Sequence, residues 1–92
     1  MIARRLTVRG RVQGVGYRDA TIGAARVCGV CGWVRNRRDG TVEAFVQGDA
    51  ACVERMIEWC RRGPPAARVI AVDIADSVVE ASLADFAMRP SA

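Results

Sequence analysis

A single dipeptide near the middle of the chain, Asp39-Gly40, constrains the fold more than any other feature. Asp-Gly between two β-type segments is among the strongest signals for a tight turn between antiparallel strands. The preceding segment, Cys31 to Arg37, has the apolar content of a strand. The following segment, Thr41 to Gln47, alternates, with Val42, Ala44 and Val46 on one face. The two segments are therefore predicted to form a β-hairpin.

An amphipathic segment lies on each side of this hairpin. Residues 18–28 are rich in alanine, with apolar residues at helical spacing, and Gly29 is a natural helix stop. Residues 50–62 place apolar side chains at i, i+3, i+4 and i+7 and charged side chains on the opposite side. Asp49 is a plausible N-cap for this second segment, and residues 63–65 (Gly-Pro-Pro) end it. Two helices are predicted.

Further strands are predicted before and after the helices. Residues 4–9 and 69–74 alternate, the latter with Ile70, Val72 and Ile74 on one face, and residues 86–88 are expected to form a short edge strand. The order is β-α-β-β-α-β with a possible fifth strand. This order predicts an α+β fold of the ferredoxin-like type, an antiparallel sheet of four to five strands with both helices on one face. That topology hosts catalysts, RNA-binding modules and metal carriers, so it names no function.

The length of 92 residues fits one domain, residues 1–92, and 51% hydrophobic residues suffice for a core. No apolar run approaches the roughly 20 residues needed to cross a bilayer. The first residues are basic but lack the apolar stretch of a signal peptide. A cytoplasmic protein with no membrane partner is the expectation, and we expect a monomer.

The charged residues exclude several kinds of chemistry. The net charge is +4, and all 14 basic residues are arginine. A basic surface attracts anions in general, phosphate esters and nucleic acid included. Without lysine, a Walker-type phosphate lysine and a Schiff base are excluded. Without histidine, there is no imidazole base, no Ser–His or Cys–His couple and no imidazole metal ligand.

The four cysteines are not expected to form a metal site. Cys28 and Cys31 have the C-x-x-C spacing that can bind zinc or carry out redox chemistry. Cys52 and Cys60, however, lie on one predicted helix, about 12 Å apart along its axis at 1.5 Å per residue. They cannot share a tetrahedral zinc ion with ligands at about 2.3 Å. Core thiols and one reducible pair are the expectation; whether Cys28 and Cys31 form a disulfide stays open.

The loop between the first strand and the first helix is the best candidate for a functional site. Residues 10–18 contain glycines at 10, 14 and 16 and end in Arg18. Glycine-rich backbone can turn N–H groups inward around an anion, and a helix N-terminus adds further unpaired donors. Arg18 can offer a planar pair of donors to two phosphate oxygens. From composition alone, an anion-binding loop and a plain connector with an exposed arginine are equally supported.

Three segments resemble the signatures of the acylphosphatase family. Residues 12–18 (V-Q-G-V-G-Y-R) match the pattern V-Q-G-V-x-[FY]-R. Residues 32–43 match G-W-V-x-N-x-x-D-G-x-V-E, and residues 59–69 match W-x-x-x-G-P-x-x-A-x-V. The segments occur in family order and at family spacing, and the resemblance covers roughly residues 4 to 89.

The resemblance implies an enzyme that needs no metal or cofactor and hydrolyses acyl phosphates to a carboxylate and inorganic phosphate. By motif position, Arg18 binds the substrate phosphate and Asn36 orients the attacking water. The backbone amides of the loop complete the phosphate site; they belong to Gln13, Gly14, Val15, Gly16 and Tyr17. The physiological acyl phosphate cannot be named from the sequence.

Other interpretations stay open beside this one. Asn36 can instead cap the turn before Asp39-Gly40. Asp19, next to Arg18, can compete with phosphate for the guanidinium, although consecutive side chains on a helix diverge by about 100°. Glu43 is expected to be solvated.

An RNA-binding module of the same topology is disfavoured because the third strand offers only Phe45 for stacking. An acylphosphatase-like accessory domain of a larger hydrogenase-maturation protein is a further alternative.

Overall fold

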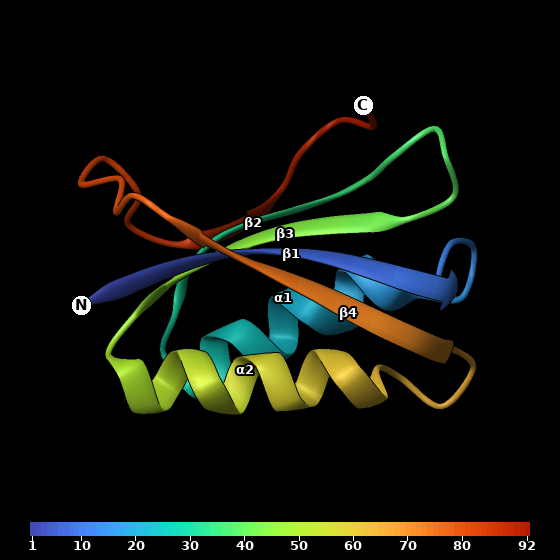
Figure 1. Ribbon diagram of the computed structural model, residues 1–92, viewed down its shortest axis with the longest axis horizontal. Helices are drawn as coiled ribbons and strands as arrows, with labels where there is room; N and C mark the ends of the chain where they lie inside the picture. The colour runs from blue at the N-terminus through green and yellow to red at the C-terminus, as the bar shows by residue number, and fades with distance from the viewer.

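The predicted hairpin lies inside a five-stranded sheet in the computed structural model, which describes residues 1–92. Strands β2 (Cys31–Asn36) and β3 (Val42–Gly48) pair antiparallel on either side of the Asp39-Gly40 turn. The strand order is β4-β1-β3-β2-β5, so β3 is the central strand (Figure 1). Strand β1 (Ile2–Arg11) pairs antiparallel with both β3 and β4 (Arg68–Ser77). The predicted element order is therefore confirmed.

Both helices cover the same face of the sheet, as expected for a ferredoxin-like fold (Figure 1). Helix α1 spans Tyr17–Cys28, and α2 spans Ala50–Arg62. The apolar side of α2 is buried against the sheet because its spacing keeps these side chains on one face. Asp49 precedes α2 but makes no side-chain capping bond. Neither helix has the length and apolarity required to span a bilayer. The main core contains Leu6, Val8, Val34, Ala44, Val46, Val53, Met56 and Cys60, among others.

The fifth strand makes the sheet mixed. Strand β5 (Phe86–Met88) pairs with β2 in parallel, so the expectation of a wholly antiparallel sheet is wrong for this pair. The cause is the route of the chain, which leaves β4 at one edge of the sheet and reaches β5 at the other edge (Figure 1). Gln47 fixes this crossing segment through its side-chain amide, which donates to and accepts from the backbone of Glu80, both at 2.8 Å.

A β-bulge interrupts the alternation predicted for residues 69–74. The β1–β4 register shifts where Arg9 pairs with Ala71 and Gly10 with Val69, leaving Ile70 as the extra residue. Val69 and Val72 pack against the core, while Ile70 is 79% exposed. The prediction that Ile70 shares a face with Val72 is therefore wrong. Bulges of this kind twist an edge strand and make it a poorer template for further pairing.

Arginines cover the sheet face that has no helices. There Trp33 and Phe45 stack with ring centroids 6.2 Å apart, and both are buried. Three guanidinium groups lie over the Trp33 ring, those of Arg5, Arg35 and Arg89, at 5.6, 4.9 and 4.7 Å from its centroid. A guanidinium stacks favourably on an indole ring. This face is therefore not an open aromatic platform.

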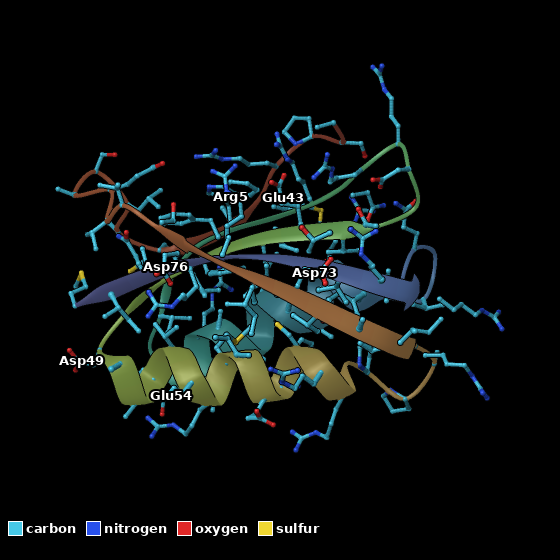
Figure 2. All side chains as sticks on the ribbon, in the orientation of Figure 1. Arg5, Glu43, Asp49, Glu54, Asp73 and Asp76 are labelled. Atoms are coloured by element: carbon cyan, nitrogen blue, oxygen red, sulfur yellow. The ribbon has the colours of Figure 1, made fainter.

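Glu43 lies under these arginines, and the expectation that it is solvated is wrong. Only 3% of its surface is exposed. One carboxylate oxygen accepts from Arg35 Nε at 2.6 Å, and the other lies 3.5 Å from Arg5 Nη1 (Figure 2). A buried carboxylate is tolerated because it is paired and hydrogen-bonded.

All four cysteines are free thiols, and no three metal-ligand side chains converge anywhere in the chain. Cys28 ends α1 and Cys31 begins β2, both half-buried, whereas Cys60 is buried in the core. Burial raises the pKa of the Cys60 thiol to about 12. Since the thiolate is the reactive form, Cys60 is expected to be inert at neutral pH.

We expect iodoacetamide at about pH 8 to alkylate the half-buried cysteines of the native protein and to leave Cys60 unmodified. Peptide mass spectrometry after a timed quench measures each site separately. Denaturant added before the reagent is the control, since it exposes all four thiols equally. Equal labelling rates for Cys60 and Cys28 in the native protein would contradict this assignment.

Candidate functional site

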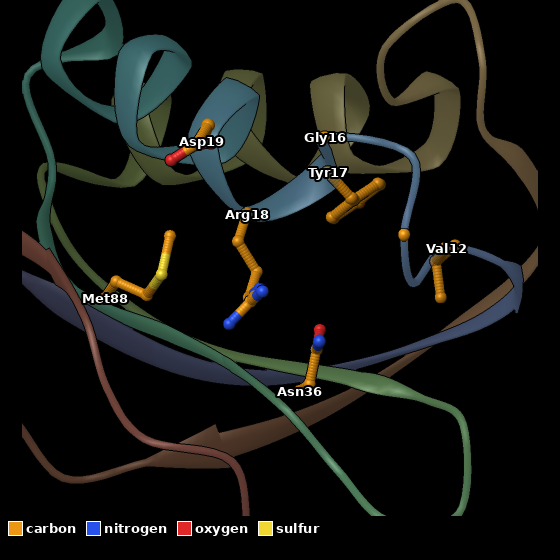
Figure 3. A pocket seen from close by; sticks show the side chains of 8 residues that line it. Val12, Gly16, Tyr17, Arg18, Asp19, Asn36 and Met88 are labelled. Carbon is orange, nitrogen blue, oxygen red and sulfur yellow. The ribbon is translucent and has the colours of Figure 1, made fainter.

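A pocket of about 160 Å³ lies where the β1–α1 loop faces the end of β2. Figure 3 shows the Arg18 side chain reaching from the start of α1 toward Asn36, whose amide points back into the pocket. Two residues that are 18 positions apart in the sequence are thus brought together. The lining residues are Val12, Gly14, Gly16, Tyr17, Arg18, Asp19, Asn36 and Met88.

The loop presents a run of unpaired backbone donors. The first N–H of α1 with a backbone acceptor is that of Ala20, which donates to the Gly16 carbonyl at 3.1 Å. From Gln13 through Asp19, no backbone N–H donates to any protein acceptor. Successive free N–H groups, followed by the positive end of a helix dipole, form a site that suits an anion.

Two glycines give the loop its shape. Gly14 and Gly16 have φ angles of 73° and 78°, in the left-handed region that side chains with a Cβ rarely adopt. A Cβ at either position would meet no atom within 4 Å, so conformation and not space requires glycine there. Not every loop residue turns its side chain inward, since Val15 packs against the core and Gln13 reaches the β2–β3 hairpin. Neither Gln13 nor Val15 is among the residues that line the pocket.

Arg18 is half-buried and forms no ion pair. Its guanidinium is therefore free to bind an anion from the pocket. Asp19 lines the same pocket but is not within ion-pair distance of Arg18. The two side chains leave the helix in different directions (Figure 3), as the 100° step between consecutive helical residues requires. Competition by Asp19 for the guanidinium is absent from this arrangement.

Tyr17 supports the loop from beneath. Its ring is 2% exposed and lies 5.7 Å from that of Trp59, and its hydroxyl donates to the Cys60 carbonyl at 2.7 Å. Gly63 closes over this ring, and a Cβ at that position would come within 2.7 Å of a ring carbon. Burial holds the pKa of Tyr17 far above its ordinary value, so it is no acid or base at neutral pH. The third sequence motif thus packs against the first.

Asn36 is the last residue of β2, and its side chain lacks a partner. The amide oxygen Oδ1 is buried and accepts no hydrogen bond from the protein. Buried polar atoms are nearly always satisfied, so an orphan acceptor in a pocket marks a place for water or a ligand. The alternative role of Asn36 as a turn cap does not hold, because Asp39 performs that role.

Asp39 fixes the turn that follows β2. Its Oδ1 accepts from the backbone N–H of Thr41 at 3.0 Å and from the Thr41 hydroxyl at 2.6 Å. These two hydrogen bonds, the hydroxyl first, hold the pKa of Asp39 below its ordinary value of 3.8. A carboxyl group whose pKa is lowered by folding stabilises the fold above its ordinary pKa, and this contribution disappears as the pH falls through the lowered value.

We therefore expect an Asp39→Asn variant to lose less stability than the wild type between about pH 4 and pH 2. Asparagine keeps the acceptor oxygen for Thr41 but has no proton to gain. Urea unfolding at a series of pH values, followed by circular dichroism, measures the difference. If the free energy of unfolding falls equally with pH in the two proteins, the Asp39 contacts do not contribute to the pH dependence of stability.

Met88 is a pocket residue that the sequence motifs did not indicate. It belongs to the short strand β5 and borders the pocket on the side of Arg18 away from Val12 (Figure 3). Its side chain is 40% exposed. Because β5 joins β2 only through a long-range parallel pairing, no local pattern could place Met88 beside Arg18.

The arrangement can bind a tetrahedral anion and hold a water molecule next to it. Free N–H groups and one guanidinium supply donors on one side, and an amide oxygen without a partner lies opposite. No histidine or lysine is present to transfer protons. The fold and the pocket therefore define a small α+β protein whose loop between the first strand and the first helix is suited to an anion.

Comparison with known proteins identifies the family. The acylphosphatase family model matches residues 4–88. An acylphosphatase of Acidiphilium cryptum is 54% identical over 80 residues, which cover 87% of this chain and 86% of that protein. The crystal structure of acylphosphatase from Bacillus subtilis superposes with a TM-score of 0.92 at 31% identity, covering 97% of this chain and 99% of that one. The chain belongs to the acylphosphatase family.

A larger protein contains a similar domain. Full-length HypF, crystallised in a phosphate- and nucleotide-bound form, matches with a TM-score of 0.88 and 25% identity. The match covers 98% of this chain but only 12% of HypF. The same fold therefore occurs both as a free-standing acylphosphatase and as one part of a longer chain.

Proposed function

We propose that this chain hydrolyses the carboxyl–phosphate bond of acyl phosphates, using water and no metal ion. One observation supports the proposal: Arg18, which has no ion-pair partner, and Asn36, whose Oδ1 has no hydrogen-bond partner, line one pocket together with loop residues whose backbone N–H groups are unpaired. Family membership supports the same activity. The substrates are small acyl phosphates, and inorganic phosphate is the product that this pocket also binds.

The phosphate group occupies the concave side of the loop. Backbone N–H groups from Gln13 to Tyr17 donate to its oxygens, and Arg18 contributes a pair of charge-assisted hydrogen bonds. Phosphoryl transfer depends chiefly on positioning and on stabilising charge on the equatorial oxygens. Donors held by the backbone need no rearrangement during the reaction.

Asn36 holds the attacking water. Its Oδ1 accepts one O–H of the water, which directs a water lone pair toward phosphorus. An amide does not take up a proton at neutral pH, so Asn36 orients the water without acting as a base. The water proton passes to a phosphate oxygen, and the P–O bond to the acyl group breaks. The products are a carboxylate and dihydrogen phosphate.

The leaving group explains why so few side chains are needed. A carboxylate is a weak base with a pKa near 4, so no general acid has to protonate it. The absence of histidine is therefore no obstacle to this reaction.

Four free thiols fit a reducing compartment, and we propose a monomer that works in the cytoplasm.

The test is hydrolysis of benzoyl phosphate by the folded protein in the presence of a chelator. The reaction is run in ¹⁸O-labelled water, and the label is expected in inorganic phosphate, as attack on phosphorus requires. Inorganic phosphate is expected to inhibit competitively. A folded sample that gives no rate above the spontaneous one, or label in benzoate only, would refute the proposal.

Nucleic acid as a substrate or partner gains no support from the sheet. The aromatic rings that could stack on bases, Trp33 and Phe45, are 3% and 1% exposed. Arginine side chains cover the indole ring. Base stacking requires accessible ring faces, so the RNA-binding alternative is not proposed.

A further inference from the structure

The side chain of Gln13 connects the loop to the hairpin that follows Asn36. Its Nε2 donates to the Arg37 carbonyl at 2.7 Å and to the Thr41 carbonyl at 2.9 Å. A primary amide has two N–H donors, and here each has its own acceptor. The two acceptors lie on opposite sides of the hairpin turn, where the Arg37 N–H also donates to the Thr41 carbonyl at 2.9 Å. Gln13 thus holds both ends of the turn.

The sheet provides no direct link of this kind. The β1–β3 pairing ends at Val8 and Val42, and beyond Val8 strand β1 pairs only with β4. No strand pairing therefore joins the loop to the end of β2. Of the hydrogen bonds in the structure, only the two from Gln13 join residues 12–17 to residues 36–41.

We propose that Gln13 is a positioning residue that sets the phosphate-binding loop at a fixed distance from Asn36. The inference rests on the proposed function, in which the loop holds the phosphate and Asn36 holds the water. Asn36 directly precedes Arg37, so an amide bridge to the Arg37 carbonyl fixes the end of β2 relative to the loop. In-line attack requires that the water and the phosphorus atom be correctly placed relative to each other. A misplacement of about 1 Å can slow a reaction about a hundredfold.

The experiment compares Gln13→Met with a matched control, Gln47→Met. Gln47 also makes two side-chain hydrogen bonds to backbone, on Glu80 at the far end of the sheet. Gln13→Met is expected to lower kcat by about 10- to 100-fold and to change the Ki of inorganic phosphate by no more than about threefold. Gln47→Met is expected to keep the wild-type kcat. A loss of phosphate affinity equal to the loss of kcat would overturn the inference, since the side chain would then serve only to fold the loop.

A double-mutant cycle tests whether Gln13 acts through Asn36. In an Asn36→Ala background, Gln13→Met is expected to have almost no further effect on kcat. Without the Asn36 amide, the attacking water is no longer held, so a shift of the loop relative to residue 36 has no further effect. Additive effects of the two substitutions would contradict the inference. Full activity of Asn36→Ala alone would refute the proposed role of Asn36. A wild-type protein that does not hydrolyse benzoyl phosphate would refute the proposed function, so the failures are distinguishable.

If Gln13→Met does not fold, a second variant tests whether the Gln13 side chain bridges the loop and the hairpin. Gln13→Glu has the same size, but its carboxylate faces two carbonyl acceptors and repels them. When protonated, it regains one donor. Its kcat relative to the wild type is therefore expected to rise as the pH falls toward about 5. A constant ratio across this range would count against a bridging role.

Discussion

Replacement of Arg18 by alanine is expected to lower kcat/KM for benzoyl phosphate by about a thousandfold. The guanidinium forms no ion pair in the protein, so its hydrogen bonds are available to the phosphate both in the bound substrate and in the transition state. Both binding and rate should therefore fall, and the Ki of inorganic phosphate should rise. Initial-rate kinetics with phosphate as inhibitor measure both effects.

The matched control for Arg18→Ala is Arg55→Ala, which removes the same charge from an exposed position on α2. The Arg55 side chain makes one hydrogen bond, to the Cys52 sulfur at 3.3 Å, and no ion pair. Wild-type kinetics in this control would show that net charge is not the cause. Arg18→Lys is expected to recover only part of the rate, because an ammonium group lacks the planar pair of donors. Wild-type phosphate affinity in Arg18→Ala would refute the placement of Arg18 in the site.

Asn36→Ala is expected to lower kcat by about 100-fold or more while phosphate affinity changes little. The substitution removes the oxygen that we propose accepts the water, and leaves the loop amides and Arg18 in place. The measured signature is thus a fall in kcat at nearly constant Ki for phosphate, unlike that of Arg18→Ala. An equal loss of affinity and rate would mean that Asn36 binds the phosphate itself.

The elements of the fold were predictable where the signal is local. The Asp39-Gly40 turn, the apolar side of α2 and the short strand β5 all occur where the sequence patterns placed them. The parallel pairing of β5 was not predictable, because it depends on the path of residues 78–85 across the molecule. The bulge at Ile70 likewise depends on how β1 and β4 align, which neither strand encodes alone.

The candidate site was partly predictable for the same reason. Arg18 and Asn36 lie in recognisable motifs, and the structure brings both to one pocket. Two features could not be inferred: the hydrogen bonds of the Gln13 side chain to the hairpin, and the position of Met88 in the pocket. Each depends on contacts between segments far apart in sequence. Glu43 was misjudged because alternation predicts which face a residue occupies and not what covers that face.

The arginines stacked on Trp33 have a consequence for the architecture of the whole molecule. A sheet with helices on one side only must shield its other side by some means, often by a further layer or a partner. Here three planar guanidinium groups on flexible side chains cover the Trp33 ring, and the Glu43 carboxylate neutralises part of their charge. A short polypeptide can thus keep both sides of its sheet dry. Lysine could not replace these residues without loss, since a round, strongly hydrated ammonium group does not lie flat on a ring.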